Sequence, residues 1–309
     1  MSLARGIAAP IPAIRPLPRR AAALDRESVH VWAAMAAVGF LAFFIGYPIL
    51  ANLVISLQEV TLGNIASWDR PFVGLDNYRE VIADPTFRGV VWNTLVFTAA
   101  NVLLSCLLGL ALALLFDLGF PGAAFLRGVL LLGWILPPMV VGAVFKWLMA
   151  TDAGLFNALA GTRIHWLSDP DMALVSVTLA NVWYGTPFSM ILIAAGLAGV
   201  PQELYEAAAI DGAGRIRRFF RVTLPILMPT LLAVLALSTV YTLRVFDLIW
   251  TMTRGGPVDS TNILPLWSFL NSFELFRFGP GAALATISLG LVLVVGLLYI
   301  RSLRSETRL

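Results

Sequence analysis

The sequence predicts an all-α integral membrane protein with six transmembrane helices and both termini in the cytoplasm. Three observations support this fold class: a composition poor in charge, long uncharged intervals, and an uneven distribution of arginines. Of the 309 residues, 59% are hydrophobic and only 13% are charged, whereas a soluble domain usually carries about 25% charged residues. A chain of this composition has too few polar side chains to cover a soluble surface.

Uncharged intervals mark the six expected spans. A helix needs about 20 apolar residues to cross the hydrocarbon core of a membrane, and in lipid the backbone must satisfy its own hydrogen bonds. Five intervals exceed 20 residues and the third has 18. The intervals are residues 28–58, 89–116, 128–145, 172–202, 222–243 and 278–300.

The basic residues predict the orientation of these spans. With the N-terminus inside, 13 of the 21 basic residues fall in cytoplasmic segments and seven fall outside, while Arg244 lies within the fifth span. Cytoplasmic loops are enriched in Lys and Arg, so both termini are expected inside. The net charge of +3 therefore reflects topology and carries no implication of nucleic-acid binding.

The rest of the chain is organised around these spans. Residues 1–27 are rich in Pro, Ala and Arg, which predicts a disordered cytoplasmic tail before a membrane domain at residues 28–309. Pro187 should kink the fourth span. Outside the membrane we expect a short interfacial helix at residues 155–159, and residues 260–273 are predicted to form a surface or re-entrant segment rather than a seventh span.

The sequence offers no enzymatic or metal site. The single cysteine, Cys106, gives no disulfide framework, and His30 and His165 lack the spacing of metal ligands. We find no cluster of nucleophile, base and acid, so no catalytic residue and no bound cofactor or metal is expected.

The segment between spans four and five, about residues 201–225, predicts a short cytoplasmic helix–turn–helix. Pro201 suits the beginning of a helix, Glu203 and Glu206 suit its positive end, and Gly212 can terminate it with a positive φ. One face, lined by two alanines, carries residues at i, i+3, i+4 and i+7 spacing: Leu204, Ala207, Ala208 and Asp211. Such a face suits either docking of a partner or an amphipathic helix on the membrane surface, and physical chemistry alone leaves both open.

The same segment resembles the EAA loop of binding-protein-dependent ABC importer permeases. That pattern is Glu-Ala-Ala, three residues, Gly, nine residues, Ile, one residue and Leu-Pro. The chain has Glu206-Ala207-Ala208, Gly212 and Leu224-Pro225 at these spacings, with Val222 in place of the isoleucine.

Shorter motifs extend the resemblance to the carbohydrate branch of this family, which includes maltose and glycerol-3-phosphate permeases, and to the first of its two paired permeases. They occur in the expected order: Val73-Gly74-Leu75-Asp76-Asn77-Tyr78, Asn93-Thr94-Leu95, Phe246-Asp247, and Thr253-Arg254-Gly255-Gly256-Pro257.

The resemblance implies a type I ABC importer permease fold in a bacterial-type cytoplasmic (inner) membrane. It implies that residues 201–225 form a coupling loop, in which Glu206 pairs with a basic residue of a cytoplasmic ATPase and Gly212 shapes the turn. The implied partners are a second permease subunit, two ATPase subunits that use ATP and Mg, an extracytoplasmic solute-binding protein and membrane lipid. The lone lysine, Lys146, precedes Trp147, so the phosphate-binding motif G-x-x-x-x-G-K-[ST] is missing here and the ATPase must be a separate chain.

Candidate residues of the translocation pathway come from two places. Arg244 and Asp247 are three apart near the outer end of span five, within ion-pair reach on one helix face; we expect them either to line the pathway or to neutralise each other within a packed interface. Asn181, Trp183 and Tyr184 near Pro187 could stack on and bond a sugar, or could be packing residues. Asn93 and Asn101 in span two are expected to be inter-helix hydrogen-bond donors.

Two rival functions remain for comparison. A secondary active transporter needs buried carboxylates near the membrane midplane, for which Asp247 is the sole candidate, and a membrane enzyme needs a catalytic cluster. No motif in the sequence identifies the transported solute, which leaves a sugar, a polyol and a glycerol phosphodiester as alternatives.

Overall fold

The computed structural model describes residues 19–67 and 69–306, which are helical apart from turns, loops and one isolated bridge between Gln58 and Phe72. The chain divides into two compact units, residues 1–51 and 52–309. Residues 1–18 of the predicted tail lie outside the described residues. Residues 19–27 are the first turns of helix α1, so the prediction of a disordered tail does not hold for them.

The first unit is a long helical segment. It comprises α1 (Arg19–Leu41), a π-helical turn η1 (Ala42–Gly46) and the beginning of α2 (Tyr47–Ser56). Residues Val29–Ser56 are long and apolar enough to cross a membrane. Most of their exposed side chains are apolar, as expected of a helix that faces lipid, and His30 near the beginning is an exposed polar residue.

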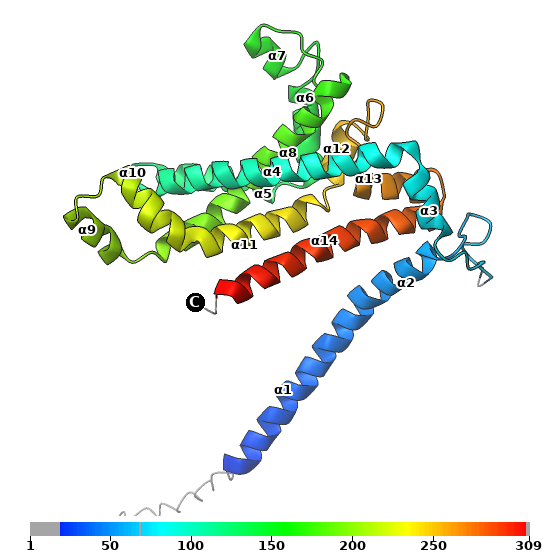
Figure 1. The fold of residues 1–309 in the computed structure, drawn as a ribbon, viewed down its shortest axis with the longest axis horizontal. Coiled ribbons are helices and arrows are strands. Elements are labelled where there is room, and N and C mark those ends of the chain that lie inside the picture. Colours follow the sequence, from blue (N-terminus) through cyan, green and yellow to red (C-terminus); the bar gives the residue numbers. More distant parts are fainter. Residues whose placement is uncertain (1–18, 68, 307–309) are drawn as a thin grey trace, which may run out of the picture. The chain divides into compact units, whose positions relative to one another are not determined.

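Four long helices form the body of the second unit and run alongside one another (Figure 1). They are α4 (Pro85–Asp117), α8 (Pro170–Ala198), α11 (Leu224–Thr242) and α14 (Phe278–Glu306). The short helix α3 (Asp76–Ala83) precedes α4, and Asp84 caps α4 by accepting a hydrogen bond from the Thr86 amide. Each of these long helices lies in a segment apolar enough to span, and these segments correspond to predicted spans two, four, five and six.

Close packing of α4 against α8 builds the centre of the unit. Gly109 makes the contact possible, because a Cβ atom there would lie 2.6 Å from Ser189 Cβ and 2.9 Å from the Met190 amide nitrogen. Ser189 and Met190 are fully buried. Small residues at such a crossing let two membrane helices approach closely.

We expect Gly109→Leu to destabilise this crossing by about 1–3 kcal/mol, the usual cost of overpacking a filled core. The matched control is Gly128→Leu in α5, where an added Cβ would meet no atom within 4 Å. Thermal unfolding of the detergent-purified chain measures the difference. Equal melting temperatures for the two variants would show that the α4–α8 crossing is not tight.

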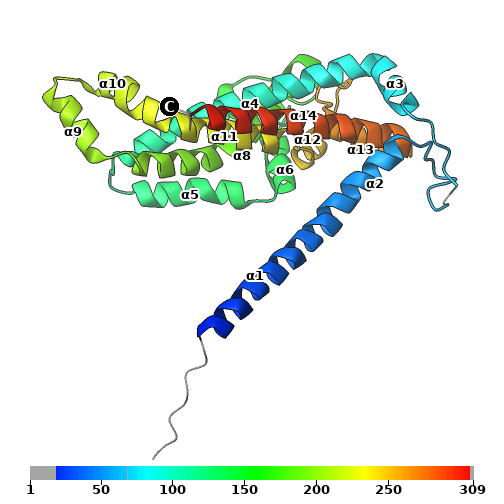
Figure 2. The same ribbon diagram turned by 60° about the horizontal axis from the view of Figure 1, so that its bottom comes forward.

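The third predicted span, residues 128–145, is not one straight helix. It is divided into α5 (Ala123–Ile135) and α6 (Pro138–Leu148), which meet at 102°. Leu136 and Pro137 adopt extended ψ angles of 143° and 135°, because a residue before proline is forced out of the helical region. Figure 2 shows α5 alongside α8, with α6 turning away from the direction of α5.

Short helical pieces lie toward the end of the unit where α4 begins, namely α12 (Asp247–Met252), α13 (Leu264–Phe269) and the π-helical turn η3 (Leu270–Glu274). The α7 helix (Leu155–Ala160) follows α6 and lies away from this end (Figure 1). The α7 helix matches the helix predicted at residues 155–159. Residues 260–273, predicted to be a surface or re-entrant segment rather than a seventh span, contain only the short α13 and η3 and are not among the helices long enough to span. Leu264, Leu266 and Trp267 are buried, so the segment does not lie on the surface.

At the opposite end of the bundle, three helical pieces join α8 to α11 (Figure 1). They are α9 (Gln202–Ile210), α10 (Arg215–Arg218) and the π-helical turn η2 (Phe219–Thr223). This is the helix–turn–helix that the sequence predicts between spans four and five.

Candidate functional site

The first candidate site is the α9 helix with the turn that follows it. Asp211 is its C-cap and Gly212 has a φ of 73°. The Gly212 amide donates to the Ala209 carbonyl (3.0 Å) and the Ala213 amide donates to the Ala208 carbonyl (2.9 Å). These two bonds are the Schellman motif, which ends a helix with a left-handed residue. Gly212 therefore occupies the turn position that the sequence predicts for it.

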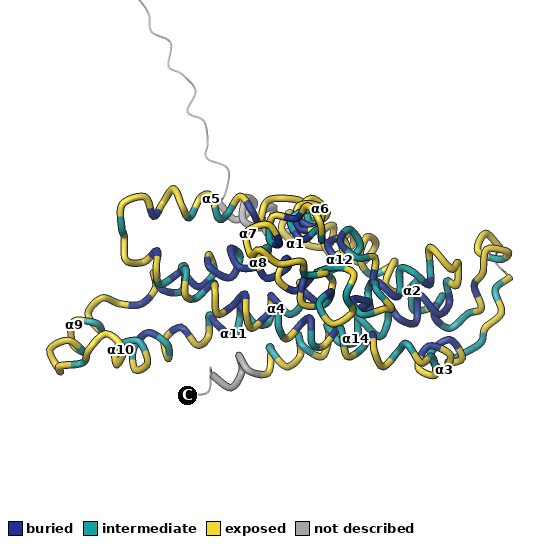
Figure 3. Tube along the Cα trace, turned by 90° about the horizontal axis from the view of Figure 1, so that it is seen from above, coloured by how far each residue is buried: buried dark blue, intermediate teal, exposed yellow. Residues whose placement is uncertain are grey.

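The α9 helix presents most of its surface to the outside of the chain (Figure 3). Glu206, Ala207 and Asp211 are exposed, Ala208 is half-buried, and Leu204 is 43% exposed. Apolar and acidic groups thus lie together on a helix that the rest of the described chain leaves uncovered. Exposed apolar side chains grouped in this way mark interaction surfaces.

One hydrogen bond ties α9 to the start of the next span. The hydroxyl of Tyr205 lies 3.0 Å from Oγ1 of Thr223, which is buried. Thr223 ends η2, and Leu224 and Pro225 then begin α11 without a break. A displacement of α9 is therefore expected to reach α11 directly, and Leu224 and Pro225 lie at the junction rather than on the exposed face.

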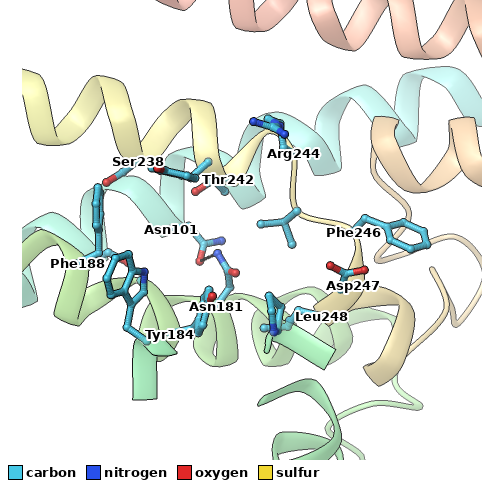
Figure 4. Close-up of a pocket in the computed structure, with 16 residues that line it drawn as sticks. Asn101, Asn181, Tyr184, Phe188, Ser238, Thr242, Arg244, Phe246, Asp247 and Leu248 are labelled. Carbon is cyan, nitrogen blue, oxygen red and sulfur yellow. Dashed lines mark hydrogen bonds between the residues drawn. The ribbon is translucent and has the colours of Figure 1, made fainter. Parts of the chain in front are cut away.

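The second candidate site is a cavity of about 410 Å³ near the middle of the second unit (Figure 4). Its wall comes from α4, α8, α11, α12, the bend between α5 and α6, and the residues between α11 and α12. The side chains combine aromatic rings with amides, hydroxyls and two charged groups. They include Asn101, Asn181, Tyr184, Phe188, Ser238, Tyr241, Thr242, Arg244 and Asp247.

A buried amide pair joins α4 to α8 at this cavity. Asn181 Nδ2 donates to Asn101 Oδ1 (2.9 Å), and Asn101 Nδ2 donates to the Phe97 carbonyl (2.7 Å). In the part of the chain that the structure describes, no donor reaches Asn181 Oδ1, although Asn181 is only 6% exposed. Its oxygen is thus an acceptor available to a solute in the cavity. Asn101 therefore joins the two helices as an acceptor and donates only within α4, whereas the sequence predicts it to be an inter-helix donor.

Arg244 and Asp247 do not share a helix face, and the expectation that they do is wrong. The α11 helix ends at Thr242 and α12 begins at Asp247, so an unwound segment separates the two. Their side chains are well apart in Figure 4. In the part of the chain that the structure describes, neither forms an ion pair. Both nevertheless line the cavity.

Trp183 stands apart from the other predicted pathway residues. Asn181 and Tyr184 line the cavity but Trp183 does not. Its ring centroid lies 5.5 Å from that of Phe145, and its ring packs against Gly133 of α5. Trp183 therefore packs the bent third span against α8, which is the packing role that the sequence analysis left open for it.

Sequence reasoning missed several cavity residues that helical spacing could have found. Asn181, Tyr184, Gly185 and Phe188 stand at i, i+3, i+4 and i+7 of α8, and they share one face. Asn101 and Ser105 are four apart on α4. From the predicted Asn181 and Tyr184, the spacing on α8 leads to Gly185 and Phe188. Trp134, Ser238, Tyr241 and Thr242 were not predicted, because nothing local shows which face of a membrane helix turns inward.

Comparison with known proteins gives one consistent result. Residues 105–304 match the family model described as the binding-protein-dependent transport system inner membrane component. A sulfoquinovosyl glycerol transport system permease protein of Agrobacterium fabrum is 34% identical over 91% of this chain and 92% of its own length. A trehalose/maltose transport system permease protein of Thermococcus litoralis is 36% identical over 84% and 88%. A diacetylchitobiose uptake system permease protein of Streptomyces coelicolor is 32% identical over 91% and 87%.

The fold is also found among solved structures. A chain of a bacterial alginate ABC transporter, solved in complex with an alginate pentasaccharide-bound periplasmic protein, superposes with a TM-score of 0.78. The two chains are 18% identical over 92% of this chain and 96% of the other. At that identity the likeness concerns the fold alone.

Proposed function

This chain belongs to the family of binding-protein-dependent transport system inner membrane components, and on that premise we propose that it forms half of the translocation pathway for a sugar or sugar-like solute. It is the permease subunit of an ABC importer in the inner membrane, and ATP hydrolysis belongs to a separate partner. Family membership favours this function over a secondary active transporter or a membrane enzyme.

The proposed role in coupling to the ATPase rests on the exposure of the α9 helix. This helix lies at the end of the bundle opposite to α3, in the segment that the arginines place on the cytoplasmic side. Its Glu206 carboxylate is free of partners within the described chain. We assign α9 to a groove of the ATPase, where Glu206 meets a basic side chain and where Leu204, Ala207, Ala208 and Asp211 form the contact face.

Closure of the ATPase on binding ATP and Mg would then shift α9. The Tyr205–Thr223 contact and the unbroken passage from η2 to α11 carry this shift to the wall of the cavity. Binding energy at one end of the molecule thereby biases a two-state arrangement of the helices at the other.

The full importer needs more than this chain. We propose a second permease subunit, two ATPase subunits and an extracytoplasmic solute-binding protein as its partners. The alginate transporter with the same fold was solved with a periplasmic protein that holds the saccharide.

The cavity supports a carbohydrate-type solute. The rings of Tyr184, Phe188 and Tyr241 offer apolar faces, while Asn181 Oδ1 and Asp247 can accept from hydroxyl groups and Arg244 can donate to them. The permease relatives named above serve sulfoquinovosyl glycerol, trehalose or maltose, and diacetylchitobiose. All are glycosides, which agrees with this lining.

Glu206→Arg tests the coupling role. We expect it to weaken attachment of the ATPase on the order of tenfold or more, because a desolvated ion pair becomes a repulsive contact. Copurification of the ATPase with the tagged permease complex measures the attachment. Glu203→Arg is the control, since Glu203 is an exposed carboxylate in the first turn of the same helix. Equal retention of the ATPase by both variants and the wild type would remove Glu206 from the interface.

A further inference from the structure

An arginine cluster at the beginning of the fifth span belongs neither to the α9 helix nor to the cavity. Four of the seven residues from 215 to 221 are arginines, and none of the seven is acidic. In the part of the chain that the structure describes, none of these arginines forms an ion pair. The arginine cluster (Arg215, Arg217, Arg218 and Arg221) therefore concentrates positive charge without an internal counter-charge.

The arginine cluster stands at the level where a membrane span begins. The α10 helix passes through η2 into α11 without a break, and residues Arg215–Thr242 together are long and apolar enough to cross a membrane. Figure 1 shows α10 leading into α11, while α9 lies further from the body of the bundle. The side chains that open a span lie among the lipid headgroups, here on the side that the arginines mark as cytoplasmic.

Two apolar side chains beside the arginines are also exposed. Ile216 is 77% exposed and Phe220, four residues later, is 60% exposed. Phe219 is half-buried and Thr223 is buried, so these two residues mark the inward face of the same helical turns. Exposed apolar side chains next to basic ones are typical of a helix at the boundary between lipid headgroups and acyl chains.

Two of the arginines form a row that suits a phosphate group. Arg217 and Arg221 are exposed and four residues apart, which places them on one face of the helix, next to Ile216 and Phe220. A guanidinium group presents five donors in a planar fork that matches the oxygens of a phosphate. Arg218 provides a further donor, because its buried Nε–H has no hydrogen-bond partner in the described chain. The cluster thus offers several donors to an oxygen from outside the chain.

We propose that the arginine cluster binds the phosphate headgroup of an anionic phospholipid in the cytoplasmic leaflet, with Arg217 and Arg221 as the main donors. Anionic headgroups attract arginines at the cytoplasmic end of a span, and the exposed pair of Ile216 and Phe220 supplies an apolar contact for the acyl chains. A lipid bound here fixes the depth of η2 in the bilayer. Through the contact of Thr223 with Tyr205, it also restrains α9.

The ATPase is a less suitable occupant of this face. The α9 surface assigned to it carries the exposed carboxylates of Glu206 and Asp211, so the complementary groove is expected to be basic and would repel a further cluster of arginines. The lipid site can also be tested apart from transport, because the lipid binds without ATP and without solute. Failure of the importer function would therefore leave the lipid site intact, and failure of the lipid site would leave the importer function intact.

The double substitution Arg217→Gln/Arg221→Gln tests the lipid site in the complete importer purified in detergent. Native mass spectrometry compares the binding of phosphatidylglycerol with that of phosphatidylcholine of the same acyl chains, and it also reports which subunits are present. We expect the wild type to prefer phosphatidylglycerol and the double variant to lose about tenfold or more of that preference. An unchanged preference would overturn the proposal, as would loss of the ATPase or of the second permease subunit, because the arginines would then belong to a protein interface.

The matched control is Arg79→Gln/Arg163→Gln, which removes the same charge from two exposed arginines that pair with carboxylates. An equal loss of preference in this variant would assign the effect to net charge and overturn the local site. Ile216→Ser/Phe220→Ser keeps every arginine and should weaken phosphatidylglycerol binding about threefold or more, because the apolar contact with the acyl chains is lost. No effect of this variant would identify the ligand as a phosphate anion and overturn the lipid assignment.

Discussion

Replacing Gly212 by valine is expected to weaken attachment of the ATPase at least tenfold while the spans still insert. Gly212 has a φ of 73°, and holding a β-branched residue there costs about 1–3 kcal/mol. The chain would relieve this strain by leaving the left-handed conformation, which breaks the Schellman bonds to Ala208 and Ala209. The turn after α9 would then no longer have a defined conformation. Copurification of the ATPase and import by the reconstituted complex measure the effect.

Gly214→Val provides the control for this substitution. Gly214 has a φ of −66° and ψ of 167°, which valine adopts readily, and an added Cβ would meet no atom within 4 Å. We expect this variant to keep its ATPase. Undiminished attachment and transport in Gly212→Val would show that the turn does not shape the docking surface.

Arg244→Ala is expected to reduce import at least tenfold without altering assembly. The Arg244 guanidinium lines the cavity and has no ion-pair partner in the described part of the chain, so its donors are available to a solute. A hydrogen bond from a charged group contributes about 1.5–3 kcal/mol, which corresponds to one or two factors of ten in a binding constant. Uptake of radiolabelled solute by proteoliposomes measures the loss.

A second arginine separates this effect from a general loss of charge. Arg163 is exposed and forms an outer ion pair with Asp152 at 2.6 Å, and exposed pairs contribute about 0–1 kcal/mol. Arg163→Ala should therefore transport at the wild-type rate. Wild-type import by Arg244→Ala would exclude Arg244 from the solute pathway.

The spans and the α9 turn were predictable because their signals are local. Lipid requires long apolar helices, so charge-free intervals locate the spans in the second unit. Gly212 is the residue type that a left-handed helix end prefers, and the structure places it there. The break in the third span was also predictable, since Leu136-Pro137-Pro138 forces extended backbone. It was missed because residues 128–145 form one uncharged interval, which was taken as a single span.

The break between α11 and α12 was not predictable in the same way. Residues 243–246 are Leu-Arg-Val-Phe, with neither glycine nor proline, so tertiary packing rather than local preference unwinds the backbone there. Arg244 and Asp247 were expected to form a pair on one helix face. In the structure they are separate groups that line the same cavity. The sequence left Trp183 open between solute contact and packing, because an aromatic ring that packs against a glycine looks in sequence like one that faces a solute.

The most direct test of the central claim is ATP-dependent uptake by proteoliposomes that contain this chain with its partner permease, its ATPase and the solute-binding protein. The importer function predicts uptake that requires internal ATP and external binding protein, and that persists when ionophores collapse the ion gradients. Uptake that an ion gradient drives in the absence of ATP would contradict the importer function of this chain.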